Sequence, residues 1–251
     1  ETVYFFVEFV CVFPWKCVSL NNQNREKIMD GILRKLPIGI QTFEKLREGD
    51  YLYVDKTALV WRIASTETPY FLSRPRRFGK SLLLSTFEAY FEGKKELFEG
   101  LAIADMEKEW KTYPVFHLDL NAEKYDSPQA LVEILSRQLT QWELKYGKGE
   151  DEETLSGRFA GVIRRACEQS GRGVVVLVDE YDKPLLQALD DGTLLDDYRK
   201  TLKAFYGVLK SSDRYLRFVF LTGVTKFAQV SVFSDLNQLN DIRSEEHTSE
   251  L

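Results

Sequence analysis

The segment Arg74-Pro75-Arg76-Arg77-Phe78-Gly79-Lys80-Ser81 lies between an apolar run, Tyr70-Phe71-Leu72, and an amphipathic helical pattern. A phosphate-binding P-loop occupies this position in a protein, between the end of a strand and the first turn of a helix. Its successive backbone N–H groups surround the phosphate oxygens. The segment therefore predicts a P-loop.

The general P-loop pattern is G-x-x-x-x-G-K-[ST], in which the lysine contacts the β- and γ-phosphates and the hydroxyl binds Mg²⁺. Gly79, Lys80 and Ser81 match its second half, and Arg74 stands in place of its first glycine. We expect phosphate-binding groups from the consecutive residues Arg77, Phe78, Gly79, Lys80, Ser81 and Leu82. A basic surface turn is the alternative interpretation, in which Arg76 and Arg77 are simply solvated.

A second motif is the apolar run Val174-Val175-Val176-Leu177-Val178, which ends in Asp179-Glu180. A run of apolar β-formers predicts a strand that is buried on both faces of a parallel sheet. An acid at the end of such a strand helps hold Mg²⁺, and a following Glu can activate the attacking water. We therefore assign Asp179 to the metal and Glu180 to catalysis. The alternative is a core strand that runs into a polar loop.

A third apolar run, Leu216 to Leu221, ends in Thr222-Gly223. A hydroxyl at the end of a strand can reach the γ-phosphate or the attacking water, so Thr222 is the predicted sensor. Thr225 and Lys226 follow it, and a plain turn explains these two equally well. His117 and Asp119 share one face of another predicted strand. We interpret that pair as structural, because polar residues on a strand usually satisfy local hydrogen bonds.

The coarse secondary structure is an alternation of strands and helices. Short extended segments are predicted at 36–40 and 51–54 around a turn at 47–50, and strands near Pro69, Val115, Val174 and Leu216. Helices are predicted from Asp55 to Ala64, from Lys80 to Glu92, and over 128–144, 152–169 and 196–209. This order is typical of a mainly parallel sheet flanked by helices.

The composition fits one α/β domain with a large core, because the 251 residues are 44% hydrophobic and 29% charged. A net charge of −5 gives no support for direct binding of nucleic acid or of an anionic membrane. The 3 cysteines show no disulfide or zinc spacing, which fits the cytoplasm. With only 2 histidines, carboxylate and Mg²⁺ chemistry is favoured over histidine chemistry.

The two ends differ from the rest of the chain. Residues 1–28 contain an apolar stretch interrupted by Glu8 and Pro14, which is ill-formed for a signal or a membrane anchor. We interpret 1–28 as translated upstream sequence, Met29 as the natural start, and 243–251 as an artefactual tail. The expected organisation is a lead-in at 29–68 and a P-loop ATPase domain at 69–242, truncated near Ile242.

Several strings together resemble the AAA-ATPase-like proteins of bacteria. The resemblance covers most of residues 36–242 and rests on Leu36–Ile40, Tyr53–Thr57, Phe71–Ser81, Val178–Pro184 and Leu221–Phe227. That family shares the arginine at the first P-loop position, so the resemblance implies a variant loop that is intact. It also implies a protein partner or a C-terminal nuclease-like domain beyond this chain. DNA cleavage is not inferred for the chain itself.

The resemblance implies an additional-strand P-loop NTPase, in which the Thr222 strand separates the P-loop strand from the Asp-Glu strand. A fifth strand, supplied by residues 233–242, is expected on the outer side of the P-loop strand. The predicted function is Mg²⁺-dependent ATP hydrolysis, with ATP and Mg²⁺ as ligands. Two alternatives stay open: a nucleotide-gated binding module with little turnover, and a phosphotransferase.

Overall fold

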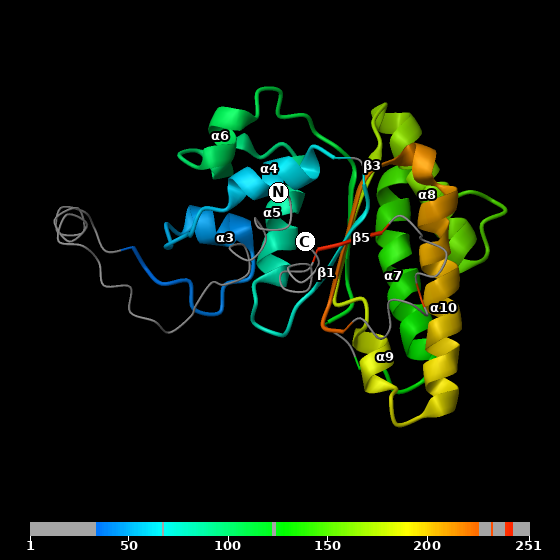
Figure 1. The fold of residues 1–251 in the computed structure, drawn as a ribbon. Coiled ribbons are helices and arrows are strands. Elements are labelled where there is room, and N and C mark those ends of the chain that lie inside the picture. The colour runs from blue at the N-terminus through cyan, green and yellow to red at the C-terminus, as the bar shows by residue number, and fades with distance from the viewer. Residues whose placement is uncertain (1–33, 67, 122–123, 226–231, 233–238, 243–251) are drawn as a thin grey trace, which may run out of the picture.

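The computed structural model describes residues 34–66, 68–121, 124–225, 232 and 239–242. The interpretations of 1–28, of Met29 as the start, and of 243–251 fall outside these ranges, and so does Lys226. Within them the chain forms a central sheet with helices on both faces (Figure 1). The predicted α/β class is therefore confirmed.

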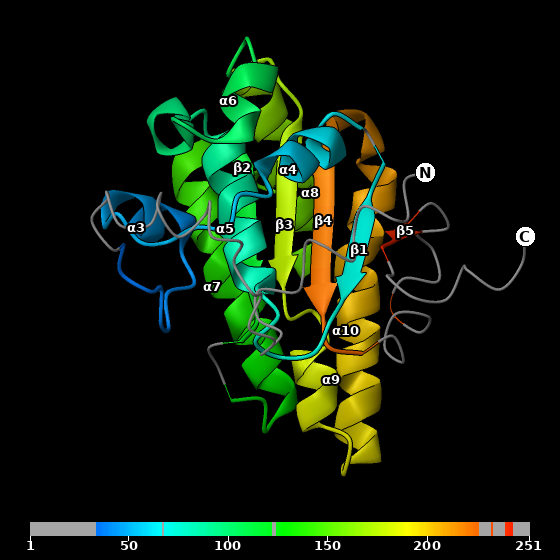
Figure 2. The ribbon, with the colours of Figure 1, turned by 60° about the vertical axis from the view of Figure 1, so that its left-hand side comes forward.

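The sheet has 5 strands in the order β2-β3-β4-β1-β5, and all the pairings are parallel. In Figure 2 the arrowheads of β3, β4 and β1 point the same way. The strands are β1 (Tyr70–Ser73), β2 (Val115–Asp119), β3 (Val174–Asp179), β4 (Leu216–Gly223) and β5 (Asn240–Asp241). β4 separates β1 from β3, as predicted, so the polar residues after three strands meet at one edge of the sheet.

The predicted fifth strand is present but short. Tyr70 and Phe71 of β1 pair with the two residues of β5. Asn240 N donates to Pro69 O at 2.8 Å and Ile242 N donates to Phe71 O at 2.9 Å. The amino-terminal half of β1 is thereby paired on both sides, with β4 and with β5.

Two helical layers enclose the sheet (Figure 1). One layer holds α3 (Phe43–Glu48), α4 (Thr57–Ala64), α5 (Lys80–Phe91) and α6 (Ala102–Met106), with a 3₁₀ turn at Lys95–Phe98. The other holds α7 (Pro128–Tyr146), α8 (Leu155–Ser170) and α10 (Gly192–Ser211). The short helix α9 (Lys183–Gln187) follows β3, and a 3₁₀ turn at Asp213–Tyr215 precedes β4.

Strand alternation divides the core between the two layers. In β3, Val174, Val176 and Val178 pack in the cluster formed with α7, α8 and α10. Val175 and Leu177 pack in the cluster formed with α4 and α5. A strand buried on both faces has no polar alternation, which is why β3 appears in the sequence as an unbroken apolar run.

Local signals set several helix boundaries. Asp191 Oδ1 accepts from the N–H groups of Thr193 and Leu194, both at 3.0 Å, so α10 begins at Gly192 and not at the predicted 196. At the start of α4, Asp55 Oδ1 accepts from Thr57 N at 2.8 Å. These side chains satisfy N–H groups that the helix itself leaves unpaired.

The lead-in differs from its prediction. The turn expected at 47–50 is present, since Asp50 N donates to Arg47 O at 3.2 Å, but it ends a helix that was not predicted: α3 occupies 43–48 and buries Phe43 and Leu46. Its two buried residues are one turn apart, and a single such pair is too short to show helical periodicity. Tyr51, in the second predicted extended segment, forms a parallel bridge with Lys35. The first segment, 36–40, is not fully extended, because the chain turns at Ile38 and Gly39.

Candidate active site

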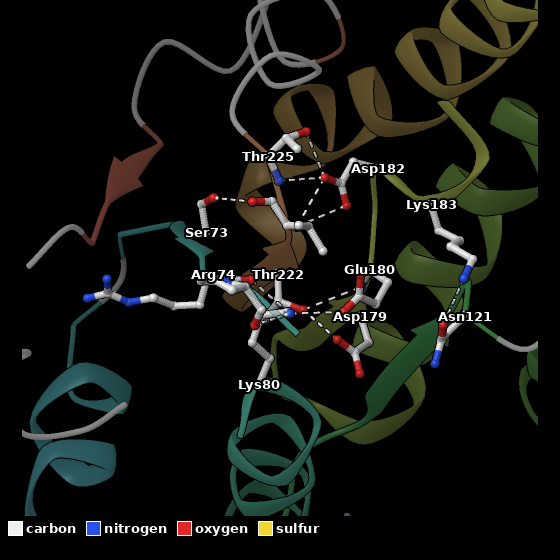
Figure 3. A network of polar contacts seen from close by, with 12 residues as sticks. Ser73, Arg74, Lys80, Asn121, Asp179, Glu180, Asp182, Lys183, Thr222 and Thr225 are labelled. Atoms are coloured by element: carbon white, nitrogen blue, oxygen red, sulfur yellow. Dashed lines mark hydrogen bonds and ion pairs between the residues drawn. The ribbon is translucent and has the colours of Figure 1, made fainter. Parts of the chain in front are cut away.

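Four of the predicted site residues converge where β1, β3 and β4 end and α5 begins (Figure 3). Lys80 is the first residue of α5, Asp179 ends β3 and Glu180 follows it. Thr222 lies near the end of β4. These four side chains are buried or nearly so, with residue exposures of 9% or less. Three segments far apart in the sequence thus build one polar centre inside an apolar core.

The loop between β1 and α5, predicted to bind phosphate, contains two residues with left-handed backbone. Gly79 precedes α5 with φ +76°, and Arg77 also lies in the left-handed region with φ +68°. A non-glycine residue rarely adopts that conformation, and such outliers gather at functional sites. The first N–H groups of α5 have no acceptor inside the helix. Their partial positive charge suits an anion.

Arg74, at the first-glycine position, continues the strand instead of joining the predicted phosphate-binding residues. Its backbone N donates to Gly223 O at 3.1 Å, which extends the pairing of β1 with β4 by one residue. Its side chain points away from Lys80 and Glu180 (Figure 3). Glycine is therefore not required here, because Arg74 continues the strand pairing and its φ is not positive.

The remaining predicted loop residues take different positions. Phe78 is 39% exposed, and Arg76 and Arg77 are exposed as well. Ser81 lies in the first turn of α5. Leu82 packs against the core cluster, so it offers only its backbone to a ligand.

Lys80 is bound by oxygens on three sides. Its Nζ lies 2.9 Å from Glu180 Oε1 and donates to the carbonyls of Arg74 at 3.0 Å and Pro75 at 3.3 Å. Only 4% of the Lys80 side chain and 11% of the Glu180 side chain are exposed. The predicted phosphate-binding lysine and the predicted catalytic glutamate thus form a buried ion pair.

Thr222 links the two carboxylate residues at the end of β3. Its Oγ1 donates to Asp179 Oδ1 at 2.5 Å and accepts from Glu180 N at 3.3 Å. Glu180 has φ +54°, so the chain turns sharply directly after the strand. One hydroxyl group therefore orients Asp179 and holds the strained backbone of Glu180.

Sequence reasoning assigned no role to Asp182, which is fully buried beside this centre. Its carboxylate accepts from Thr225 N at 2.7 Å and from Thr225 Oγ1 at 2.9 Å. Thr225 therefore serves the loop after β4 and does not face Lys80. Its partners lie more than 40 residues away in the sequence, so no local pattern could have identified them.

His117 and Asp119 have local partners, as their structural interpretation requires. His117 Nδ1 lies 2.9 Å from Glu88 Oε2 on α5, and Asp119 Oδ1 accepts from Asn121 N at 2.8 Å. Burial by itself lowers the pKa of His117, but the hydrogen bond and charge of Glu88, with Asp179 and Asp119, outweigh it and raise that pKa above its ordinary value.

The described residues show no sign of two other classes of site. No helix in them is long and apolar enough to cross a bilayer. Nor do they contain a group of three or more His, Cys, Asp or Glu placed to hold a metal ion by itself.

Comparison with known proteins identifies the family. The profile of the family described as Predicted AAA-ATPase matches residues 37–233. The chain belongs to this family. The matched range runs from the lead-in through β4, so it includes every predicted site residue. The AAA-ATPase-like description agrees with a P-loop NTPase fold and supports an ATPase-like, nucleotide-binding role.

A relative comes from Azotobacter chroococcum mcd 1 and is described as an uncharacterized protein in the vnfD 5′ region. It is 43% identical over 219 residues, which are 87% of this chain and 42% of the relative. The chain thus spans less than half of that protein's length.

Proposed function

We propose that this AAA-ATPase-like domain binds ATP and hydrolyses it with Mg²⁺. The observation that carries the proposal is the convergence of Lys80, Asp179, Glu180 and Thr222 beside the amino terminus of α5 (Figure 3). Phosphoryl transfer needs positioned positive charge, a metal and an oriented water. This cluster supplies a residue for each of these requirements.

Phosphate binding is assigned to the cradle of residues 77–82. It contains the left-handed residues Arg77 and Gly79. Loops in which successive N–H groups form a concave surface bind anions, and the dipole of α5 adds to that attraction. Lys80 extends from the first turn of α5 into the same centre. In this role its ammonium group contacts the β- and γ-phosphates.

Ser81 and Asp179 are the proposed residues of the Mg²⁺ site, because their side-chain oxygen atoms are hard ligands of the kind that Mg²⁺ prefers. In nucleotide sites Mg²⁺ takes one or two protein ligands, and phosphate oxygens and water complete its coordination. The bond from Thr222 fixes one oxygen of Asp179 and so orients its carboxylate. When bound, Mg²⁺ neutralises charge on the phosphate oxygens.

Glu180 is the proposed general base. Its carboxylate lies 2.9 Å from Lys80 Nζ, so it becomes available to a water molecule once Lys80 turns to phosphate. A lysine can exchange partners in this way, because its ammonium is a compact charge on a flexible stem. Thr222 is the proposed sensor, since its hydroxyl contacts both residues 179 and 180.

The Lys80–Glu180 pair also supports a second candidate function. If the pair re-forms while nucleotide is bound, the base is masked and the domain acts as a nucleotide-gated binding module with little turnover. Both functions require the same cradle, so the presence or absence of turnover separates them.

The test measures phosphate release and ATP binding with Glu180→Gln beside Glu133→Gln, a control on the exposed face of α7. Loss of a positioned base should lower kcat about 100-fold while calorimetry shows retained ATP binding. Glu133→Gln should match the wild type. If the wild-type protein binds ATP but does not hydrolyse it, the gated module is favoured. If it does not bind ATP, both functions are rejected.

A further inference from the structure

Asp182 uses its side chain in an unusual way for a residue at a helix start. It occupies the position before α9 yet makes no side-chain bond to that helix. Its Oδ2 instead accepts from Thr225 N at 2.7 Å, Thr225 Oγ1 at 2.9 Å and Val224 N at 3.0 Å. A carboxylate with several donors at a site of 0% exposure forms strong, directional contacts.

Tyr181 holds the same segment from the same side. Its backbone N donates to Thr222 O at 2.9 Å, and its hydroxyl donates to Thr225 O at 2.9 Å. Its ring lies so close to Gly223 that a Cβ atom there would be 2.4 Å from Tyr181 Cε1. Residues 222–225 are therefore bound along their length to the loop after β3.

The opposite side of this segment faces the P-loop. Gly223 O accepts from Arg74 N at 3.1 Å, and Val224 O accepts from Ser73 Oγ at 3.1 Å. The segment lies between the loop after β3 and the start of the P-loop (Figure 3). A shift of residues 223–225 would thus move the P-loop and Thr222 together.

We propose that Asp182 is a positioning residue of the active site, acting through residues 222–225. By holding Val224 and Thr225 it keeps Thr222 against Asp179 and Glu180, and keeps the start of the P-loop in register with them. This inference rests on the proposed ATP hydrolysis. Asp182 is assigned no role in binding phosphate or metal.

The test compares Asp182→Asn with Asp191→Asn. Both aspartates accept from two backbone N–H groups, but Asp191 caps α10 away from the site. Asparagine keeps the size of the side chain but removes the charge, and its amide N–H groups oppose the donors at residues 224–225. For hydrogen bonds to a charged group, a loss of about tenfold or more in kcat is expected.

The expected result is a kcat at least tenfold lower for Asp182→Asn, with KM for ATP changed less than threefold. Asp191→Asn should lower the melting temperature and leave kcat unchanged. An unchanged kcat in Asp182→Asn, or an equal loss in both variants, would overturn the proposal. If Asp182→Asn does not fold, Thr225→Val serves instead, because it removes only the hydroxyl donor. It should lower kcat about threefold, and an unchanged value would overturn the proposal.

Hydrogen exchange gives a readout that does not need turnover. If the wild-type protein does not hydrolyse ATP, the proposed function is rejected. The rate of hydrogen exchange at residues 71–80 then still tests the positioning role of Asp182. Asp182→Asn, or Thr225→Val in its place, should speed hydrogen exchange at residues 71–80, although the substituted residue is far away in the sequence. Asp191→Asn should leave that exchange unchanged. Unchanged exchange would overturn the positioning role by itself.

Discussion

The buried ion pair between Arg158 and Glu143 and the buried ion pair between Lys80 and Glu180 differ in how each charge is held. Arg158 donates from Nε and Nη2 to the two oxygens of Glu143, both at 2.8 Å, and from Nη1 to Ser136 Oγ at 2.6 Å. Lys80 meets one oxygen of Glu180 and otherwise backbone carbonyls of its own loop.

The difference indicates that a buried ion pair can either hold two helices together or keep a charge ready to change partners. Side-chain exposure is similar, 9% and 6% for Arg158 and Glu143 against 4% and 11% for Lys80 and Glu180. A planar guanidinium on a carboxylate is locked by geometry, whereas an ammonium can exchange one oxygen for another. The first pair joins α7 to α8, and we interpret the second as exchangeable.

Arg158→Met should give the largest effect, a loss of about 3–5 kcal/mol in the free energy of unfolding, because Glu143 stays buried without its cation. Urea denaturation measures this loss, and ATP affinity should stay within twofold of the wild type. The double variant Arg158→Met, Glu143→Leu should recover most of the stability. A small loss in the single variant would show that the pair is not structural.

Lys80→Ala should lower ATP affinity about 100-fold, because it removes the charge that the P-loop directs at phosphate. Calorimetry measures the affinity. Lys94→Ala is the matched control, since Lys94 pairs with Glu44 and Glu92 at a side-chain exposure of 34% and lies outside the site. An unchanged ATP affinity in Lys80→Ala would contradict the interpretation that Lys80 exchanges Glu180 for phosphate.

Thr222→Val should lower kcat about tenfold, because it removes the hydroxyl that orients Asp179. The variant should also need a higher Mg²⁺ concentration for half-maximal activity, which a titration of activity with Mg²⁺ measures. Thr140→Val makes the same chemical change beside the other pair, where Thr140 Oγ1 accepts from Arg158 Nη2 at 2.9 Å. That control should lose stability and keep kcat, and equal kcat losses would contradict the separate roles.

Glu88→Gln should give the smallest effect, a pH-dependent loss of stability. The pKa of His117 is raised in the folded protein, so this contact stabilises fully below the unfolded pKa of about 6.5 and fades as pH rises through the folded pKa. The melting temperature should fall by a few degrees at pH 5.5 and scarcely at pH 9. A loss independent of pH would contradict a charged His117.

The elements that the sequence predicted best have strong local signals. β3 was predicted from its apolar run, and α5 from its spacing and from Gly93, which stands just beyond its end with φ +72°. α3 and α9 were missed, because helices of six and five residues are too short to show periodicity. The arrangement of β1, β4 and β3 followed from the family resemblance and not from local pattern.

The sequence by itself determined the residue types of the site: a Gly-Lys-Ser turn at the start of a helix, and Asp179-Glu180 and Thr222 at the ends of apolar strands. Only the tertiary structure decided their partners. The bond from Thr222 to Asp179 joins residues 43 positions apart, and that from Thr225 to Asp182 also spans 43. Such contacts depend on which strands become neighbours in the sheet, and backbone periodicity carries no information about that choice.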